Sequence, residues 1–205
     1  MDYTFWTIAP IVLLPFFAFV INAFIVKKFT KLAVAISTGS IFVSFLFALR
    51  IFFDFMNVYS VGYHIHKVFP WFNLSSGSHI FEVKMGIYID NMTSVMLLMV
   101  TGVATLIHVF STWYMHDDPR FGRFFVYMSL FTSAMLGLVL SDNLLSVFIF
   151  WELMGFCSYS LIGFYYEKEG AGNASMKAFM TTRVGDVFSC WEYWQSGLWL
   201  EMFLL

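Results

Sequence analysis

Long runs of apolar residues, separated by short polar breaks, dominate the chain. The hydrocarbon core of a bilayer is about 30 Å thick, and a helix of about 20 apolar residues can cross it. On that rule the sequence predicts five complete transmembrane helices, over residues 5–26, 32–53, 87–114, 123–140 and 144–165. A partial sixth helix is expected to begin near Ser175, after the break Gly170-Ala-Gly-Asn173. The predicted fold class is all-α, a polytopic bundle of transmembrane helices.

The polar breaks define the expected loops. Residues 54–86 contain Pro70, Gly77 and three histidines, and we expect a loop there in which His64 and His66 are solvated. The turn Ser141-Asp142-Asn143 precedes the fifth predicted helix. Asp142 or Asn143 can cap that helix, because either side chain can accept a free N–H of the first turn.

Composition supports lipid as the solvent of this chain. Hydrophobic residues make up 60% of it and charged residues 12%, whereas soluble domains average about 45–50% and about 25%. The net charge is −2 and the sequence contains no basic stripe, so a nucleic-acid partner is not expected. Two cysteines are too few for a disulfide framework. The expected surroundings are the lipid bilayer and other membrane proteins.

The lysines and arginines predict an orientation, because cytoplasmic loops carry an excess of them. One set of predicted loops carries Lys27, Lys28, Lys31, Arg120, Arg123, Lys168 and Lys177. The other carries Lys67 and Lys84, with Arg50 close to that side. The first set is expected to be cytoplasmic, or on the matrix side in an organelle. The N-terminus and the 54–86 loop then face outward.

Glu152 is the most informative residue of the pattern. It lies about ten residues beyond Asp142, or roughly 15 Å along a helix, near the middle of an apolar span. An ionisable group there costs at least ~2.5–3.5 kcal/mol and normally faces the bundle interior beside a partner. Tyr159 shares its helix face and can hydrogen-bond along it, while Trp151 is expected to pack beside it. Alternatively, Glu152 is permanently protonated or permanently paired and only packs helices.

The sixth predicted helix carries three charged residues. Arg183 and Asp186 are spaced i, i+3, so they can pair on one face. Lys177 lies nearer the end of the helix, and the competing interpretation is that its ammonium reaches out to the interface.

Two further polar residues lie on the third predicted helix. His108, near its inner end, suits proton relay, although a lone histidine there is as often a packing residue. Asp90, near its outer end, is expected at the interface. The sequence contains no metal-binding or cofactor-binding pattern.

One stretch is highly specific for a known family. Residues 150–188, FWELMGFCSYSLIGFYYEKEGAGNASMKAFMTTRVGDVF, closely resemble the antiporter-like subunit of respiratory complex I. That subunit is chain L in bacteria and chain 5 in mitochondria. The resemblance is good over about residues 85–188. The corresponding large subunit of multisubunit cation/proton antiporters shares much of the pattern.

The resemblance implies a role in redox-driven proton translocation, within an antiporter-like inverted-repeat fold. The family glutamate matched by Glu152 pairs with a lysine of a seventh helix, and Arg183 and Asp186 match the family's sixth-helix residues. The implied proton-translocation residues are Glu152, Lys177, Arg183, Asp186 and His108, with Tyr159, Asp142 and Asp90 in support. NADH, FMN, iron–sulfur clusters and quinone are implied to lie on other subunits of the complex.

The resemblance also divides the chain. Residues 1–114 hold the first three helices with their outer loop, 115–188 begin the proton-translocating domain, and 189–205 form an aberrant tail. Read in a shifted frame, the codons of residues 189–196 can encode the apolar run Met-Leu-Gly-Ile-Leu-Ala-Ile. We therefore expect a frameshift or truncation after Phe188. Without the seventh helix, Glu152 would stay protonated or take Lys177 or Arg183 as its partner.

Three hypotheses follow. The first is a multi-pass membrane subunit of NADH:quinone oxidoreductase, a translocase, which as truncated would not pump protons alone. It is expected in the bacterial inner membrane, with the mitochondrial inner membrane as the alternative. The second is the large subunit of a multisubunit sodium or potassium/proton antiporter. The third is a non-functional membrane fragment.

Overall fold

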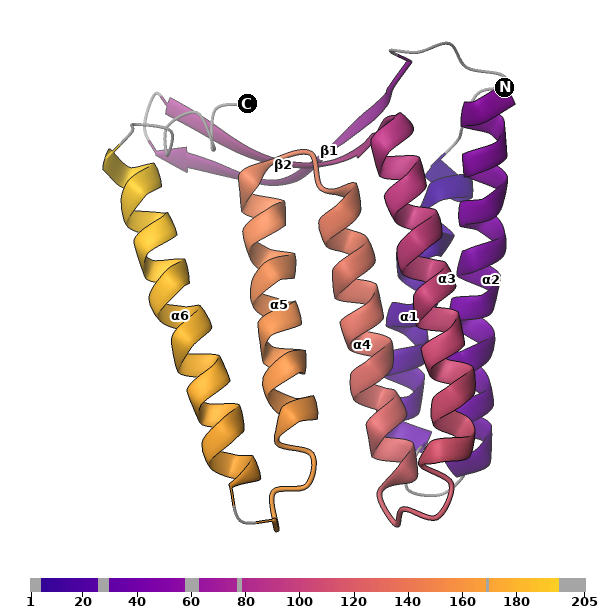
Figure 1. Ribbon diagram of the computed structural model, residues 1–205. Helices are drawn as coiled ribbons and strands as arrows, with labels where there is room; N and C mark the ends of the chain where they lie inside the picture. Colours follow the sequence, from indigo (N-terminus) through magenta and orange to yellow (C-terminus); the bar gives the residue numbers. More distant parts are fainter. Residues whose placement is uncertain (1–4, 26–29, 58–62, 77–78, 169, 196–205) are drawn as a thin grey trace.

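In the part of the chain that the structure describes, six helices run side by side and a β-hairpin lies across one end of them (Figure 1). The structure is a computed structural model that describes residues 5–25, 30–57, 63–76, 79–168 and 170–195. The helices are α1 (Phe5–Ile25), α2 (Thr30–Asn57), α3 (Asn91–Tyr114), α4 (Phe121–Leu140), α5 (Leu144–Ile162) and α6 (Ala171–Gln195). The strands are β1 (Ile65–Ser76) and β2 (His79–Ile89).

Helices α2, α3, α4 and α5 are long and apolar enough to cross a membrane. Helix α1 is also apolar, with a shorter stretch at Ile8–Phe24, and it continues unbroken through Pro10 and Pro15. A mostly helical membrane fold is therefore confirmed. Four candidate spans are found among the described residues, so the predicted number of five is not reached by this measure.

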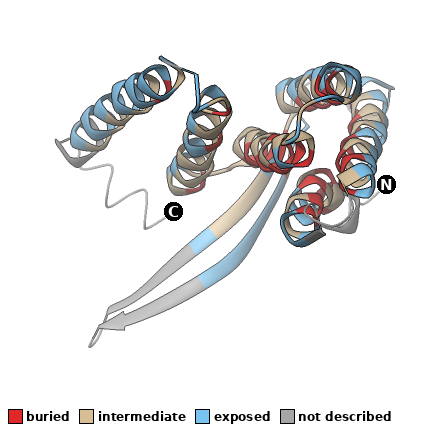
Figure 2. Ribbon diagram, turned by 90° about the horizontal axis from the view of Figure 1, so that it is seen from below, coloured by how far each residue is buried: buried red, intermediate tan, exposed pale blue. Residues whose placement is uncertain are grey.

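Helix α4 is the centre of the bundle. It packs against α1, α2, α3 and α5, and its inward residues are largely buried (Figure 2). The core between these helices and the hairpin is aliphatic. Its fully buried members include Ile11, Ile41, Ile51, Ile89, Leu97 and Leu136. Within α5, by contrast, only Ser146 and Cys157 are buried, so the pair α5 and α6 is covered on fewer sides.

A buried polar contact ties α1, α2 and α4 together. The Asn22 side-chain amide donates to the Ala33 carbonyl oxygen at 2.9 Å and to Ser37 Oγ at 2.7 Å. Ser129 Oγ on α4 donates to the same Ser37 oxygen at 2.8 Å. Because a buried polar group without a partner costs about 1–3 kcal/mol, these bonds specify how the three helices meet.

The loop prediction for residues 54–86 is wrong. Helix α2 continues to Asn57, and β1 and β2, over residues 65–76 and 79–89, pair antiparallel as a hairpin. Both strands are rich in β-branched and aromatic residues, which favour a pleated strand. Pro70 has no N–H to donate, and the register shifts between Pro70 and Phe72. The all-α prediction is corrected accordingly, since the chain also contains a two-stranded sheet.

Three predicted boundaries also move. Residues 87–89, expected to begin the third helix, belong to β2, and α3 begins at Asn91. The sixth helix begins at Ala171 and not near Ser175. Gly170 precedes it with a φ of 94°, a left-handed conformation that suits glycine. Residues 189–195 of the predicted aberrant tail continue α6, and residues 196–205 lie outside the described part.

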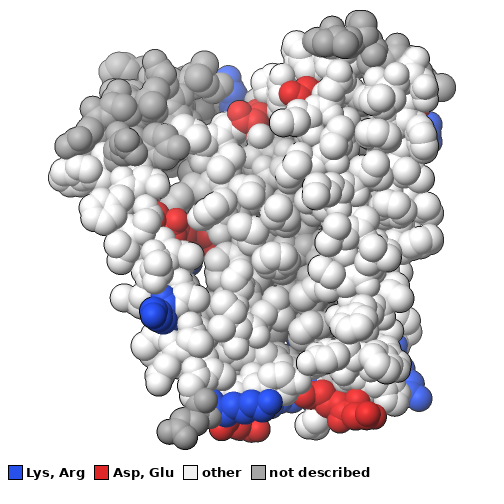
Figure 3. Space-filling model, in the orientation of Figure 1, with Lys and Arg blue, Asp and Glu red and all other residues white. Residues whose placement is uncertain are grey.

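The basic residues of the sequence pattern separate as expected. Arg120, Arg123 and Lys168 lie at the end of the bundle opposite the hairpin, whereas Lys67 and Lys84 lie on the hairpin. Lys27 and Lys28 fall outside the described residues. Figure 3 shows charged side chains at both ends of the molecule and a largely uncharged belt between them. That belt is interrupted on the side of α5 and α6.

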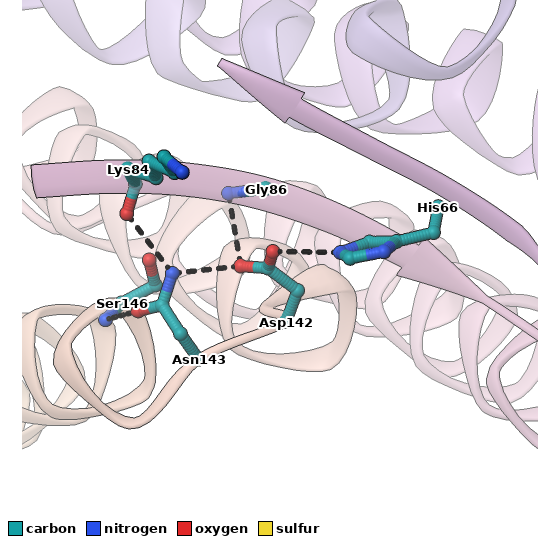
Figure 4. A network of polar contacts seen from close by, with 6 residues as sticks. All are labelled: His66, Lys84, Gly86, Asp142, Asn143 and Ser146. Carbon is teal, nitrogen blue, oxygen red and sulfur yellow. Dashed lines mark hydrogen bonds and ion pairs between the residues drawn. The ribbon is translucent and has the colours of Figure 1, made fainter. Parts of the chain in front are cut away.

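The hairpin is hydrogen-bonded to Asp142 in the turn between α4 and α5 (Figure 4). One Asp142 oxygen accepts from the Gly86 N–H at 2.9 Å, and the other lies 3.0 Å from His66 Nε2. Asn143 accepts from the Ser146 N–H at 2.8 Å and so caps α5, as predicted for this pair. Its amide also donates to the Lys84 carbonyl oxygen at 3.1 Å. The start of α5 is therefore fixed by the hairpin.

At the opposite end, Arg120 secures the loop that follows α5. Its Nη1 lies 3.5 Å from Glu167 Oε1, and its guanidinium stacks 5.0 Å from the centre of the Tyr166 ring. A hydrogen bond to Asp118 raises the pKa of the neighbouring Tyr165. Helix α5 is thus held at both ends by contacts with other elements.

The close approach of Gly86 to Asp142 allows a test of this contact between the hairpin and the α4–α5 turn. A Cβ added at Gly86 would collide with the Asp142 carboxylate, whereas one added at Gly39 in α2 would meet nothing within 4 Å. We expect Gly86→Ala to lose about 1–3 kcal/mol through the broken hydrogen bonds. In a chain of this size, each kcal/mol lost lowers the thermal unfolding midpoint by about 2–4 °C, which can be measured in detergent. Gly39→Ala, the matched control, should be neutral or slightly stabilising; equal midpoints for both variants would contradict the role of Asp142.

Candidate functional site

Glu152 lies at the middle of α5, eight residues after Leu144 and ten before Ile162. Since α5 begins at the cap fixed by the hairpin, this position is about 12 Å from the start of the helix. Its side chain is 20% exposed and faces α6. The carboxylate therefore lies mid-helix, in agreement with the depth expected from the sequence.

Arg183 on α6 is the partner of Glu152. Its Nη1 lies against Glu152 Oε2, forming an ion pair between the two helices. The guanidinium also lies 4.6 Å from the centre of the Phe179 ring, one turn earlier on α6. The cation is thus flanked by a carboxylate and by an aromatic face, which attracts it as well.

Asp186 is the second carboxylate beside the same guanidinium. Its Oδ2 lies 4.0 Å from Arg183 Nη1, at the i, i+3 spacing predicted for this pair. Its Oδ1 accepts a hydrogen bond from Trp151 Nε1 at 3.1 Å. Trp151 therefore does not simply pack beside Glu152 as expected. Its ring is 46% exposed and its N–H reaches across to α6.

The four residues border a cavity of about 210 Å³ between α5 and α6. Its lining is Trp151, Glu152, Met154, Gly155, Ser158, Tyr159, Ile162, Ala178, Phe179, Thr182, Arg183 and Asp186. A Cβ at Gly155 would stand 3.9 Å from Arg183 Nη2, so this glycine lies next to the guanidinium without being sterically required. The cavity is large enough for several waters, each of which occupies about 30 Å³ in the liquid.

The charges of this cluster do not cancel. Two carboxylates face one guanidinium, so the fully ionised cluster carries a net charge of −1. A net charge in an apolar layer is costly, and one bound proton removes it. The arrangement therefore places two carboxylates around a single guanidinium, with Glu152 in contact with it and Asp186 at 4.0 Å.

Two other predicted residues lie on the same helices outside the ion pair. Lys177 is exposed on α6, six residues before Arg183, or about 9 Å along the axis. No ion pair involves it among the described residues. The Tyr159 ring packs on Phe179 at 5.3 Å and lines the cavity. No hydrogen bond joins Tyr159 to Glu152 in the described part of the chain.

His108 lies apart from the cluster. It is buried on α3, where its Nδ1 lies 2.8 Å from the Ala104 carbonyl oxygen and its ring meets Phe125 edge-on. Helix α3 packs against α2 and α4, and His108 does not line the cavity between α5 and α6. The structure therefore does not bring this predicted site residue to the others.

Asp90 and Asp142 lie at the hairpin end. Asp90 caps α3 by accepting from the Thr93 N–H at 2.7 Å, and Asp142 holds the hairpin. Sequence reasoning missed His66, which was expected to be solvated but contacts Asp142. Its partner Asp142 is 76 residues away, so no local sequence signal predicts this contact.

Two family models match the chain. The first, described as the chain 5 N-terminus of NADH-ubiquinone oxidoreductase (complex I), matches residues 71–125. The second, described as the transmembrane region of NADH:quinone oxidoreductase and Mrp antiporters, matches residues 141–201. The second match includes the whole cluster and extends past Phe188, where the resemblance was expected to stop.

A solved structure shares the fold. The Mrp complex from a Dietzia species superposes with a TM-score of 0.67 over 87% of this chain and 18% of the matched chain, at 21% identity. At that identity the likeness concerns the fold alone.

Curated relatives are closer in sequence. NADH-quinone oxidoreductase subunit L of Rickettsia bellii is 42% identical over 95% of this chain. NAD(P)H-quinone oxidoreductase chain 5 of Synechocystis is 53% identical over 55% of it. The chain spans 30% of the length of the Rickettsia protein and 16% of the length of the Synechocystis protein. Together with the two family matches, these relatives show that the chain belongs to the antiporter-like membrane subunits of NADH:quinone oxidoreductase known as subunit L or chain 5.

Proposed function

We propose that this chain takes part in redox-coupled proton translocation as a membrane subunit of NADH:quinone oxidoreductase. The observation that carries the proposal is the pair of carboxylates, Glu152 and Asp186, that share Arg183 at the middle of α5 and α6. A structural ion pair would need one acid and one base. The second carboxylate leaves one negative charge uncompensated, and a bound proton can neutralise it.

The proposed step is a change of partner. When Glu152 is ionised it holds Arg183, and when it takes up a proton the guanidinium is released toward Asp186. The attraction between Arg183 and a carboxylate reaches several kcal/mol only where water is largely excluded. The proton arrives and leaves through the cavity beside Tyr159 and Ser158. Lys177, which the family resemblance also implicates, lies nearer the basic end of the bundle and does not line this cavity.

Electron transfer would take place elsewhere in the complex. We infer that NADH, FMN, the iron–sulfur clusters and quinone are held by other subunits, as the family resemblance implies. The chain would then act as a translocase subunit driven by conformational change in its neighbours. Other membrane subunits of the complex are its proposed partners, and the sparsely covered faces of α5 and α6 leave room for further helices.

We further propose that α1 also spans the membrane, giving five complete spans with α6 as the sixth. The N-terminus and the hairpin would face outward and the Arg120 end would face the cytoplasm of a bacterium, following the basic residues of the loops. The mitochondrial inner membrane is the alternative location. A frameshift after Phe188 remains a prediction, and the nucleotide sequence across that codon tests it.

A cation/proton antiporter is the second candidate function. The family model over residues 141–201 covers Mrp antiporters as well, and the Dietzia structure shares the fold. The curated relatives named above, which are closer in sequence, favour the oxidoreductase. Neighbouring genes discriminate the two, and failure to co-purify with any membrane complex would favour a non-functional fragment.

Glu152→Gln tests the proton role directly. The amide keeps the shape of the side chain but cannot ionise, so we expect proton pumping by the complex in membrane vesicles to fall about tenfold or more. Assembly of the complex should survive. Gly172→Ala, in the first turn of α6, outside the cavity lining and sterically tolerated, is the matched control and should pump normally. Unimpaired pumping in Glu152→Gln would remove this carboxylate from the mechanism.

The ion pair itself can be measured by a double-mutant cycle. Arg183→Gln alone leaves two carboxylates without a cation and should lower the free energy of unfolding by about 3–5 kcal/mol. The double variant Glu152→Gln/Arg183→Gln should recover part of this loss, with a coupling energy of about 0.5–3 kcal/mol. Thermal unfolding of the purified chain in detergent gives both values. Lys177→Gln serves as the exposed control, and a coupling energy of zero between Glu152 and Arg183 would contradict the pairing.

A further inference from the structure

Trp151 occupies an unusual place beside the charge cluster. It precedes Glu152 on α5, yet its indole N–H crosses to α6 and donates to Asp186 Oδ1 at 3.1 Å. The other Asp186 oxygen stops at 4.0 Å from Arg183 Nη1, the outer limit of an ion pair, whereas Glu152 lies against the same nitrogen. The two carboxylates are therefore not equivalent toward Arg183.

The unequal distances need a cause. Asp186 is on the same helix as Arg183 at a spacing that favours close pairing, so it has the easier approach to the guanidinium. Trp151 is the described residue that holds its carboxylate by a hydrogen bond. An indole N–H only donates and has no acceptor or charge of its own. A hydrogen bond to a carboxylate is also stronger than one between neutral groups.

We propose that Trp151 is a positioning residue, which holds Asp186 away from Arg183 and thereby assigns the guanidinium to Glu152. The pairing of Arg183 with Glu152 does not depend on the proposed function, whereas its consequence for proton translocation rests on that function. With Glu152 ionised, Trp151 keeps Asp186 aside. When Glu152 takes up a proton from a hydronium ion, its O–H bond forms and a water molecule is released. Arg183 then turns to Asp186, whose hydrogen bond to the indole weakens. Trp151 thus sets the balance between the two states.

The hydrogen bond can be observed without any activity. The 205-residue chain, labelled with ¹⁵N in its indole rings and placed in lipid nanodiscs, gives one N–H signal per tryptophan in an NMR spectrum. The signal that disappears in Trp151→Phe is that of Trp151. We expect the chemical shift of this signal to change with pH in the unsubstituted chain. In Asp186→Asn and in Glu152→Gln, the chemical shift should no longer depend on pH. A Trp151 signal that ignores pH and is unchanged in Asp186→Asn overturns the proposal.

The donor can then be separated from the bulk of the ring. A tryptophan isostere in which sulfur replaces the indole N–H keeps the shape and cannot donate. Placed at Trp151 in the assembled complex, it should change the pH profile of proton pumping as Trp151→Phe does. The same isostere at Trp113, an exposed residue of α3, is the control and should leave the profile unchanged. A normal profile with the isostere at Trp151 means that only packing matters there, and it overturns the positioning role.

The two measurements also separate this proposal from the proposed function. If the indole signal responds to Asp186 as expected while Glu152→Gln pumps normally, the geometric assignment holds and the translocation role fails. If Glu152→Gln abolishes pumping while the indole signal ignores Asp186, translocation holds and Trp151 has no positioning role.

Discussion

A charged side chain within a bilayer has to find its counter-charge inside the protein, and in this chain Arg183 is that counter-charge for two carboxylates. The helices α5 and α6 are joined near their middles by this guanidinium. Few of their other residues are buried against the bundle. Their relative position therefore depends on a polar cluster more than on an apolar core. The same cluster carries an odd number of charges, so the contact that holds the helices together is also the one that we propose responds to a proton.

The depth of the cluster is set from the hairpin end. Asp142 binds His66 and Gly86, and Asn143 caps the first turn of α5. Glu152 then lies about 12 Å farther along the helix because of helical geometry alone. At the other end, Arg120 fixes the loop that leads into α6. The well-packed bundle of α1–α4 thus supports the less covered pair α5 and α6, which holds the groups that we propose change partners.

Much of this arrangement is readable from the sequence, because it follows from local rules. The apolar runs give the helices, the ten residues from Asp142 to Glu152 give the depth, and the i, i+3 spacing gives the contact of Arg183 with Asp186. What the sequence does not reveal depends on distant partners. The sequence predicts a loop where the hairpin lies, because the polar and apolar residues alternate too irregularly around Pro70. His66 meets a carboxylate 76 positions away, which no local pattern indicates. Trp151 was expected to pack, since nothing local indicates an acceptor on another helix. His108 combines a titratable ring with a helical span, yet α3 carries it away from the cluster.

We propose that Glu152, Arg183 and Asp186 together hold one exchangeable proton. Infrared difference spectroscopy of the chain in lipid, recorded while the pH is changed, counts the carboxyl groups that gain or lose a proton. We predict one protonated carboxyl in this cluster, whose signal is lost in Glu152→Gln and altered in Asp186→Asn, because the two groups compete for one guanidinium. Two carboxyls that titrate independently of each other, or none that titrates while Arg183 is present, would contradict it.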